Sequence, residues 1–308
     1  MKKIGLYILI CYVGLLQAQQ DPQYSQYMFN QVVINPAYAG SKDAMNVTGL
    51  FRKEWVNVNG SPQTSNLSIS GPLKAKKIGL GGHIIQENIG PKQWMSAYLD
   101  YCYRVKIGKG KLSMGLSTGF VSYNFNTSKL DLSDQNEPIL YSNANTRALK
   151  FDMSAGLYYY SRTFYVGISA THLTSPQLFA VTSDQGEKLN FYNLNQHLFF
   201  TIGKGFSINE NLVFSPSLMI KTIKGKQINA DINANFLIKN KLWLGVSCRT
   251  SMTVVALVQF LITDKLKVGY AYDFGLKGIG RSSYGSHEIM VSFDFGSNKS
   301  KMVTTRFL

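Results

Sequence analysis

The chain has 308 residues, of which 45% are hydrophobic and 13% aromatic, and its 32 Lys and Arg against 17 Asp and Glu give a formal net charge of +15. Such a charge bears on the partners of a protein and not on its fold. After residue 18 no stretch approaches the roughly 18 uninterrupted apolar residues of a membrane-spanning helix. The richest stretch, MTVVALVQFLI, is short and is broken by Thr253 and Gln259. The sequence therefore excludes a protein that crosses a membrane with several helices.

Residues 1–18, MKKIGLYILICYVGLLQA, have the layout of a secretory signal peptide. Lys2 and Lys3 precede an apolar run that reaches the small residue Ala18. We expect cleavage after Ala18 and export of the rest, although Leu16 stands where a small residue is preferred and retention as a single anchor is the alternative. An exported chain without a further spanning helix is either soluble or a transmembrane β-barrel, whose strands need only about 9 to 11 residues.

The next segment, residues 19–45, is a polar and aromatic leader in front of a chain rich in strands. Tyr24, Met28 and Val32 recur every four residues, which predicts a short helix over residues 24–33. This helix has to end before Pro36, because a residue that precedes proline avoids the helical region. The Asn-Pro pair and Gly40 then predict a turn into the first strand.

Alternation of apolar and polar residues dominates the rest of the chain. In QINADINANFLI every second residue from Ile228 to Phe236 is apolar, and the residues between them are Asn or Asp, which is typical of a strand with one dry and one wet face. About fourteen such segments follow the leader, an even number as single-chain outer-membrane barrels require. They are expected at 46–55, 63–71, 77–88, 93–106, 111–125, 148–161, 163–172, 193–206, 211–223, 226–239, 241–250, 252–263, 265–276 and 285–296.

The connections between these segments alternate in length. If the chain starts on the periplasmic side, the odd-numbered connections are extracellular and include the two longest, NTSKLDLSDQNEPILYSNANTR and THLTSPQLFAVTSDQGEKLNFYN, whereas even-numbered ones such as PLKAKK and IKNK are short. Membrane barrels show this asymmetry, and soluble sandwiches have no reason for it. We therefore predict an all-β fold, a transmembrane antiparallel up-and-down β-barrel of about 14 strands at residues 46–296, with a leader that plugs or braces the lumen.

Two cysteines follow the signal peptide, and the strand pattern argues against a disulfide between them. Cys102 shares a face with Asp100 and Arg104, whereas Cys248 shares a face with Leu244 and Val246. If one face lines the lumen and the other meets lipid, the two thiols point in opposite directions.

Positive charge gathers on the predicted periplasmic turns and on the tail, residues 297–308. Lysines at strand ends also solvate turns and prevent edge pairing, an equally good explanation. The sharper hypothesis is that this rim docks on an acidic periplasmic protein, whereas nucleic acid is not an expected partner of an exported barrel. The lysines assigned to partner binding are Lys74, Lys76, Lys77, Lys106, Lys109, Lys111, Lys239 and Lys241, and Arg162, Lys204, Lys265 and Lys267 belong to the same rim.

The sequence offers little that is typical of an enzyme. It has no His or Cys cluster with metal-ligand spacing, no G-x-S-x-G elbow and no P-loop, so we expect no catalytic residue, no metal and no cofactor. His83 and His197 share faces with polar lumen residues, and His172 and His287 lie near strand ends. The acids of the wet face, Asp100, Asp152, Asp231, Asp273 and Asp294, are expected to be balanced by Arg104 and Arg249; a hydrolase that uses a pair of them is the less favoured alternative.

Four stretches carry a resemblance to a known family. QDPQYSQYMFNQVVINPAYAGS, FRKEWVNVNGSPQTSNLSISGPL, VGYAYDFG and GSHEIMVSFDF closely resemble the PorP/SprF family of type IX secretion outer-membrane proteins. The resemblance covers essentially the whole mature chain, and its most specific part is the N-P-A-x-A-G element after the Q-x-P-x-Y-S-x-Y leader.

The resemblance implies an outer-membrane barrel that works with the type IX secretion or gliding machinery and supports secretion or surface attachment of large adhesins. The implied partners are outer-membrane lipid, the ring and peptidoglycan-binding lipoproteins of the periplasmic machinery, and a secreted surface adhesin. Arg52 and Trp55 are expected to pin the leader turn or to face a partner. The residues that match the family motif are Asp21, Pro22, Tyr24, Ser25, Tyr27, Asn30, Asn35, Pro36, Ala37, Ala39, Gly40, Arg52, Trp55, Gly60, Pro62 and Thr64.

Two functions stay open on the sequence. The first is a non-enzymatic secretion or gliding accessory, and the second is an outer-membrane channel or porin for small solutes. The leader discriminates between them, because an open pore does not need an aromatic segment that fills it.

Overall fold

The computed structural model describes residues 21–42, 44–73, 77–126, 145–182, 188–223 and 227–296. The predicted signal peptide, the predicted basic tail and the side chains of Lys74 and Lys76 lie outside these residues. Among the described residues, no helix has the length and apolar character that a bilayer crossing requires.

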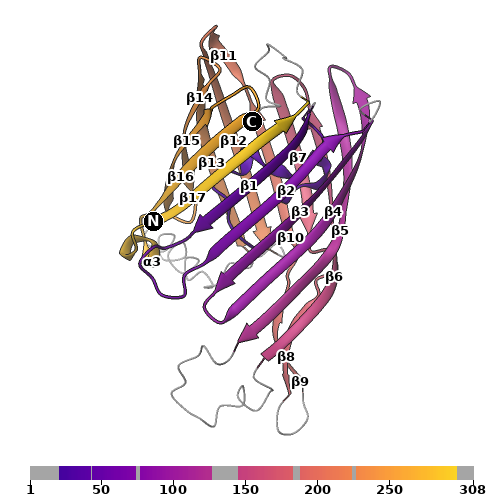
Figure 1. The fold of residues 1–308 in the computed structure, drawn as a ribbon, viewed down its shortest axis with the longest axis vertical. Coiled ribbons are helices and arrows are strands. Elements are labelled where there is room, and N and C mark those ends of the chain that lie inside the picture. The colour runs from indigo at the N-terminus through magenta and orange to yellow at the C-terminus, as the bar shows by residue number, and fades with distance from the viewer. Residues whose placement is uncertain are drawn as a thin grey trace, which may run out of the picture.

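Fourteen antiparallel strands close into a barrel (Figure 1). Neighbours in sequence pair with one another around the barrel, and β1 pairs with β17. β7 pairs with β10 across the long β7–β10 connection, and β10 pairs with β12. The barrel strands are β1 (Met45–Lys53), β2 (Gln63–Pro72), β3 (Ile78–Ile89), β4 (Lys92–Ile107), β5 (Gly110–Asn126), β6 (Asn145–Tyr160), β7 (Phe164–Thr171), β10 (His197–Lys204), β12 (Leu212–Ile223), β13 (Gln227–Ile238), β14 (Leu242–Arg249), β15 (Thr253–Leu261), β16 (Leu266–Gly275) and β17 (Ser286–Phe295).

The predicted strands agree with this barrel to within a few residues at each end, and four smaller elements were not expected. A hairpin of β8 (Gln177–Thr182) and β9 (Lys188–Asn193) projects from one end of the barrel (Figure 1). The short β11 (Phe206–Asn209) pairs with β12 beside β10, and the helix α3 (Gly278–Ser282) lies between β16 and β17.

The two ends of the barrel differ, and each is named here by its connections. The long-loop end holds the connections β1–β2, β3–β4, β5–β6, β7–β10, β12–β13, β14–β15 and β16–β17, among them the β8–β9 hairpin and α3. The short-turn end holds the other connections, together with the start of β1 and the end of β17. The longest connections therefore lie at one end, as predicted, but β3–β4, β12–β13 and β14–β15 at that end are as short as the turns at the other end.

Polarity is reversed relative to a soluble protein, with polar side chains inside and apolar ones outside. In β13 Ile228, Ile232 and Phe236 are exposed, whereas Asp231 and Asn233 between them are buried. This is the pattern of a barrel whose outer face meets lipid. The two cysteines follow it, since both are free, Cys102 is buried and Cys248 is exposed.

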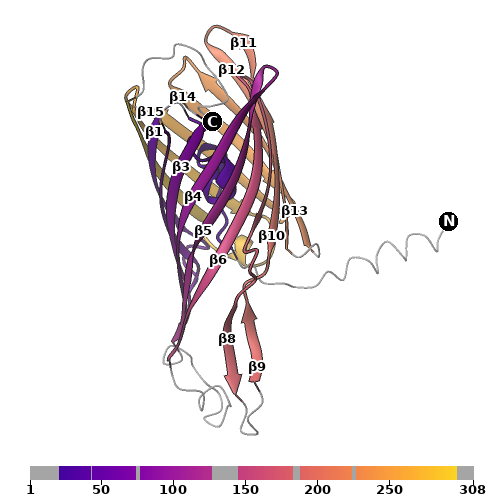
Figure 2. The ribbon, with the colours of Figure 1, turned by 90° about the vertical axis from the view of Figure 1, so that its right-hand side faces the viewer.

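Residues 21–42, called the leader below, lie inside the barrel, where Figure 2 shows their indigo turns behind β3 and β4. All of them are buried except Asp21, Gln23 and Val33, which are half-buried. The leader begins beside the long-loop end, where Asp21 contacts His172 just after β7, and reaches the short-turn end at Gly40. It therefore runs through the lumen from one end of the barrel to the other.

The predicted helix over residues 24–33 is wrong. The leader forms three separate 3-10 turns, η1 (Tyr27–Phe29), η2 (Gln31–Val33) and η3 (Pro36–Tyr38). Asn30, with φ −139° and ψ 71°, is not helical and separates the first two turns, while its side chain bonds to Asn66 and Ser68 of β2. The wall of the lumen thus supplies partners that compete with a continuous helical ladder.

Apolar side chains of the leader make the main hydrophobic core of the molecule. Phe29 packs edge-on against Trp243 with ring centroids 5.8 Å apart, and Tyr38 packs in the same way against Tyr158 at 5.4 Å. Such aromatic pairs add to the free energy gained from area burial. The core thus joins the leader to the barrel wall.

Glycines in the wall let the leader approach. A Cβ atom built at Gly115 of β5 would meet backbone atoms of Pro36 and Ala37 within 3.0 Å, and one built at Gly156 of β6 would meet the Asn35 side chain equally closely. Gly79 and Gly269 stand in the same relation to Ala39 and Gln26. The wall is therefore shaped to the leader along its length.

This shape complementarity predicts the outcome of two glycine substitutions. Gly115→Val places methyl groups where the leader backbone lies, so we expect the free energy of unfolding to fall by about 1–3 kcal/mol, as in other overpacked cores. The matched control is Gly49→Val on the outer face of β1, where an added Cβ meets nothing within 4 Å. Urea unfolding in detergent measures both. Equal effects of the two substitutions would contradict a leader seated against the wall.

Candidate functional site

Two arginines of the barrel wall hold the first residues of the leader. Arg52 of β1 donates to Ser25 Oγ at 2.7 Å and to Asp273 at 2.8 Å, and Arg249 of β14 donates to the same Ser25 oxygen at 2.9 Å and to Asp273 at 2.6 Å. Arg249 also pairs with Asp231 at 2.9 Å. These groups, together with Glu288, are called the arginine network. All of them are buried, so each charge depends on its partners.

Ser25 completes this network through its hydroxyl and its backbone. Its hydroxyl accepts from both arginines and donates to Asp273 Oδ1 at 2.6 Å. The carboxylate of Glu288 on β17 accepts the backbone N–H groups of Ser25 and Gln26, each at 2.8 Å. Side chains of four strands thus converge on Ser25 and Gln26. Carboxylates of the wall accept the hydrogen bonds of their backbone N–H groups and of the Ser25 hydroxyl.

Further along, polar side chains attach the leader to successive strands. Asn233 of β13 donates to the Tyr27 hydroxyl at 2.6 Å, and Ser169 of β7 donates to the Ile34 carbonyl at 2.6 Å. Asn35 caps η3 by accepting from the Ala37 N–H at 2.9 Å, while its amide donates to the Leu157 carbonyl at 3.1 Å. The predicted turn at the Asn-Pro pair is therefore present, with Pro36 opening a 3-10 turn.

At the short-turn end Arg104 and Cys102 of β4 hold the end of the leader. Arg104 donates to the carbonyls of Gly40 and Ile78, and the Cys102 thiol donates to the Ala39 carbonyl at 3.0 Å. Gly40 adopts a φ of +63°, a value that glycine reaches without strain. Arg104 was expected to balance lumen acids; it binds backbone carbonyls in the described part of the chain.

Four motif residues after Arg52 lie toward the long-loop end of the barrel. The Trp55 N–H donates to Ser286 Oγ at 3.2 Å, and the carbonyls of Gly60 and Pro62 accept from Gly90 and Glu54, each at 2.9 Å. Thr64 is buried at the start of β2. These residues shape the β1–β2 loop, while Arg52 is the member of this set that holds the leader.

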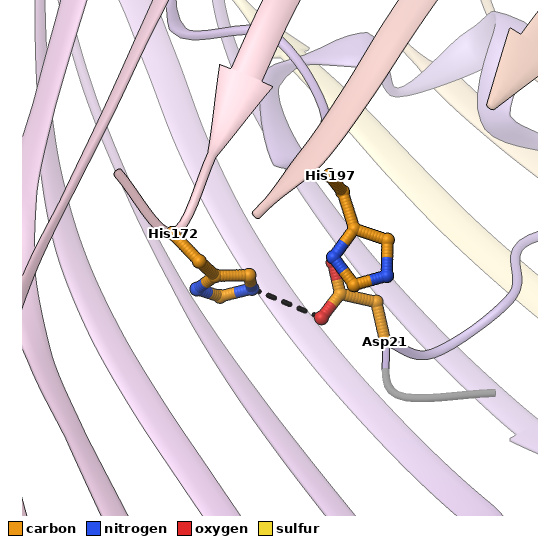
Figure 3. A group of neighbouring side chains, drawn as sticks. All are labelled: Asp21, His172 and His197. Carbon is orange, nitrogen blue, oxygen red and sulfur yellow. Dashed lines mark hydrogen bonds and ion pairs between the residues drawn. The ribbon is translucent and has the colours of Figure 1, made fainter. Parts of the chain in front are cut away.

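Asp21 forms a separate group with two histidines, called the histidine cluster, that is drawn in Figure 3. His172 Nε2 lies 2.9 Å from Asp21 Oδ1, and His197 Nδ1 lies 3.3 Å from Asp21 Oδ2. His172 Nδ1 lies 2.6 Å from Asp152 Oδ2, and Asp152 also accepts from Tyr98 at 2.7 Å. His172 is thus placed between two carboxylates.

The pKa values at this cluster follow from burial and from the neighbouring charges. Burial alone would raise the pKa of Asp21, but the charges of His172 and His197 hold it well below the usual value of a carboxyl. Burial alone would lower the pKa of His172, but Asp21 and Asp152 overcome this effect and raise it to about 9. The leader is therefore tied to the β7–β8 loop by an imidazolium near neutral pH.

The predicted rim lysines come together at the short-turn end as far as they are described. Lys77, Lys106, Lys109, Lys239 and Lys241 are exposed there, and Lys111 is half-buried. Lys267 differs from the expectation, because its side chain is buried in the lumen and pairs with Asp294 at 2.9 Å. Among the rim cations that the structure describes, Lys267 therefore does not add to the exposed charge.

Sequence reasoning missed the histidine cluster and the role of Glu288. Asp21, His172 and His197 belong to the leader, to the loop after β7 and to β10, so no local spacing connects them. Glu288 was not singled out. The alternation of β17 nevertheless places it on the polar face of the strand, as it does for Asp294.

Comparisons with known proteins agree with this architecture. The family model described as Type IX secretion system membrane protein PorP/SprF matches residues 16–293. A search of curated proteins finds no match. The chain is similar in structure to the TodX deltaS2S3 mutant monoaromatic hydrocarbon channel, with a TM-score of 0.51 at 12% identity over 86% of this chain and 94% of that one. It is also similar to the Acinetobacter baumannii outer membrane protein Omp33, with a TM-score of 0.50 at 9% identity over 83% of this chain and 100% of that one.

The arginine network predicts a large effect of removing Arg52. Arg52→Met keeps much of the side-chain volume but leaves Asp273 and Glu288 buried without one of their cations, so we expect a loss of about 3–5 kcal/mol in the free energy of unfolding. The control is Arg281→Met in α3, where the arginine is exposed. Urea unfolding in detergent compares the two. A loss for Arg52→Met no larger than that of the control would contradict the role of the network.

The pKa of His172 predicts a pH-dependent contribution to stability. Because this pKa rises from 6.5 to about 9 on folding, the contribution is fully present below about 6.5 and is lost as the pH increases through about 9. The urea midpoint of the wild type should therefore exceed that of His172→Gln most at about pH 6, and the gap should shrink by about pH 10. A gap that does not change over this range would contradict the ion pair.

Proposed function

Because the chain belongs to the PorP/SprF family of type IX secretion system membrane proteins, we propose that it is a non-enzymatic outer-membrane accessory of the type IX secretion or gliding machinery. In this role it supports secretion or surface attachment of a large adhesin-type cargo. Its short-turn end contacts the periplasmic machinery, and its long-loop end contacts the cargo.

The filled lumen is the observation that carries this proposal against the channel alternative. The leader is hydrogen-bonded to wall residues near both ends of the barrel, and its aromatic side chains belong to the main hydrophobic core. A solute would have to displace this core, at the cost of the buried ion pairs of the arginine network. Such a barrel suits a rigid membrane platform better than a pore.

The charge of the short-turn end supports the periplasmic contact. Among the described residues, its exposed lysines come from five separate connections, so they present a broad positive surface rather than one local patch. Such a surface favours encounter with an acidic protein and sets its orientation. Taking the short turns as periplasmic follows the usual asymmetry of outer-membrane barrels.

Planar-bilayer conductance tests the channel alternative directly. We expect no steady conductance from the intact protein, because the leader occupies the lumen, and steady conductance after deletion of residues 20–33. The matched control is deletion of an equal number of residues from the β5–β6 connection. Steady conductance of the intact protein would favour the small-solute channel.

Crosslinking from native membranes tests the periplasmic contact. Reversing Lys106, Lys109, Lys239 and Lys241 to Glu should reduce recovery of type IX periplasmic components, and added salt should reduce recovery by the wild type, because exposed charges are screened. The control reverses Lys150 and Lys277, which are exposed near the long-loop end. If the rim variant recovered as much as the control, the electrostatic contact would be wrong. If the wild type recovered neither periplasmic components nor an adhesin, the assigned role would be wrong.

A further inference from the structure

The histidine cluster contains donor atoms that the secretion role does not use. Asp21, His172 and His197 come from three distant parts of the chain, and one ligand atom from each lies within 4.8 Å of the others. The side chains of His172 and His197 are 5% and 0% exposed, and that of Asp21 is 12% exposed. Figure 3 shows both imidazole rings directed at the Asp21 carboxylate. We propose that these three residues bind one divalent transition-metal ion of the zinc class.

The spacing of the donor atoms is close to that of a metal site. A tetrahedral zinc site with bonds of about 2.0–2.1 Å places its ligand atoms about 3.3 Å apart. Asp21 Oδ1 lies 2.9 Å from His172 Nε2, and Asp21 Oδ2 lies 3.3 Å from His197 Nδ1. One ligand atom of each residue lies within 4.8 Å of the other two, so the three groups have to approach one another slightly to share one ion.

Groups behind the ligands support His172 in this role. Metal-binding histidines usually direct their second ring nitrogen to a carboxylate or to a backbone carbonyl, which orients the ring. Asp152 serves His172 Nδ1 in this way at 2.6 Å, and Asp152 is itself held by Tyr98 and Thr174, each at 2.7 Å. This arrangement directs Nε2 of His172 at Asp21 and makes it available as a ligand.

His197 differs from His172 and has an unused atom. Its Nδ1 lies 2.9 Å from the Asn195 carbonyl and 3.3 Å from Asp21, and its Nε2 is buried without a hydrogen-bond partner among the described residues. A buried nitrogen without a partner is costly unless it has a ligand. Its tautomer decides whether Nδ1, which faces Asp21, or Nε2 supplies the lone pair.

Charge and ligand type decide which ion fits. The carboxylates of Asp21 and Asp152 together balance the two positive charges of the ion when both histidines are neutral. Imidazole nitrogen with carboxylate oxygen suits zinc and its neighbours, whereas calcium and magnesium prefer oxygen ligands alone. Binding replaces the proton that His172 shares with Asp21, so this proton is released to the buffer. The bound ion would fasten the start of the leader to the β7–β8 loop and to β10.

Zinc titration of the intact mature protein tests the site. The protein is purified in detergent without a histidine tag, treated with a chelator and titrated with Zn²⁺ by calorimetry in two buffers of different ionisation enthalpy. We expect one Zn²⁺ per chain with release of a proton, and no comparable binding of Mg²⁺. Asp21→Asn and His197→Gln should weaken binding by about 100-fold or more, and Asp152→Asn by about 10- to 100-fold.

The matched control is His83→Gln. His83 is also a buried lumen histidine paired with a carboxylate, at 3.0 Å from Asp100, but it lies outside the cluster. Heat-modifiable migration in gels verifies that each variant forms a barrel, and Asp21→Asn, which changes no strand, carries the comparison if His197→Gln does not fold. Absence of stoichiometric Zn²⁺ binding would overturn the proposal. So would binding that Asp21→Asn leaves unchanged, or binding that His83→Gln weakens equally.

Discussion

The bond network that Arg52, Arg249 and Asp273 form around Ser25 is the constraint on which the rest of the structure depends. Strands that face lipid on one side must direct their polar side chains into the lumen. Charges gathered there are expensive to bury unless each has a partner. Ser25 supplies the hydroxyl at the point where both arginines and Asp273 meet, and Glu288 accepts the adjacent backbone N–H groups. The leader is therefore part of the interior that allows this barrel to close.

This constraint explains features that are far apart in the sequence. Wall glycines such as Gly115 and Gly156 stand where the leader backbone comes closest. Arg104 at the opposite end points at the Gly40 carbonyl, because the leader has to turn there into β1. A barrel fixed from within at both ends offers two rims of defined shape. That property suits a protein that holds other components of a secretion machine in place.

The fold was predictable from the sequence because its signal is periodic and repeated. Alternation in segments such as QINADINANFLI predicts that the segment is a strand and which of its faces meets lipid. An even number of such segments indicates a closed barrel. The short hairpin β8–β9 escaped prediction because it lies within a long connection whose residues alternate weakly. The spacing of Tyr24, Met28 and Val32 suggested a helix, but local spacing does not include the competing bonds that Asn30 makes with β2.

The site was less predictable than the fold because its contacts join distant parts of the chain. Arg249 was correctly expected to meet lumen acids, since both lie on the wet face of strands. Ser25 bonds to Glu288, which is 263 residues away in the sequence. The three members of the histidine cluster also come from three different parts of the chain. A family motif marks Asp21, Ser25 and Arg52 as a set without saying which wall residue each one meets. Only the closed barrel gives that information.

Hydrogen–deuterium exchange on the intact protein in detergent tests most directly whether the leader is an integral part of the barrel. The amide groups of Ser25 and Gln26 are bonded to the buried Glu288 carboxylate, so peptides that cover residues 21–33 should exchange as slowly as those of the strands. Residues 57–60 of the β1–β2 loop, of which Asn57, Asn59 and Gly60 are exposed, provide the reference. Exchange of the leader as fast as that of this loop would contradict a lumen filled by residues 21–42.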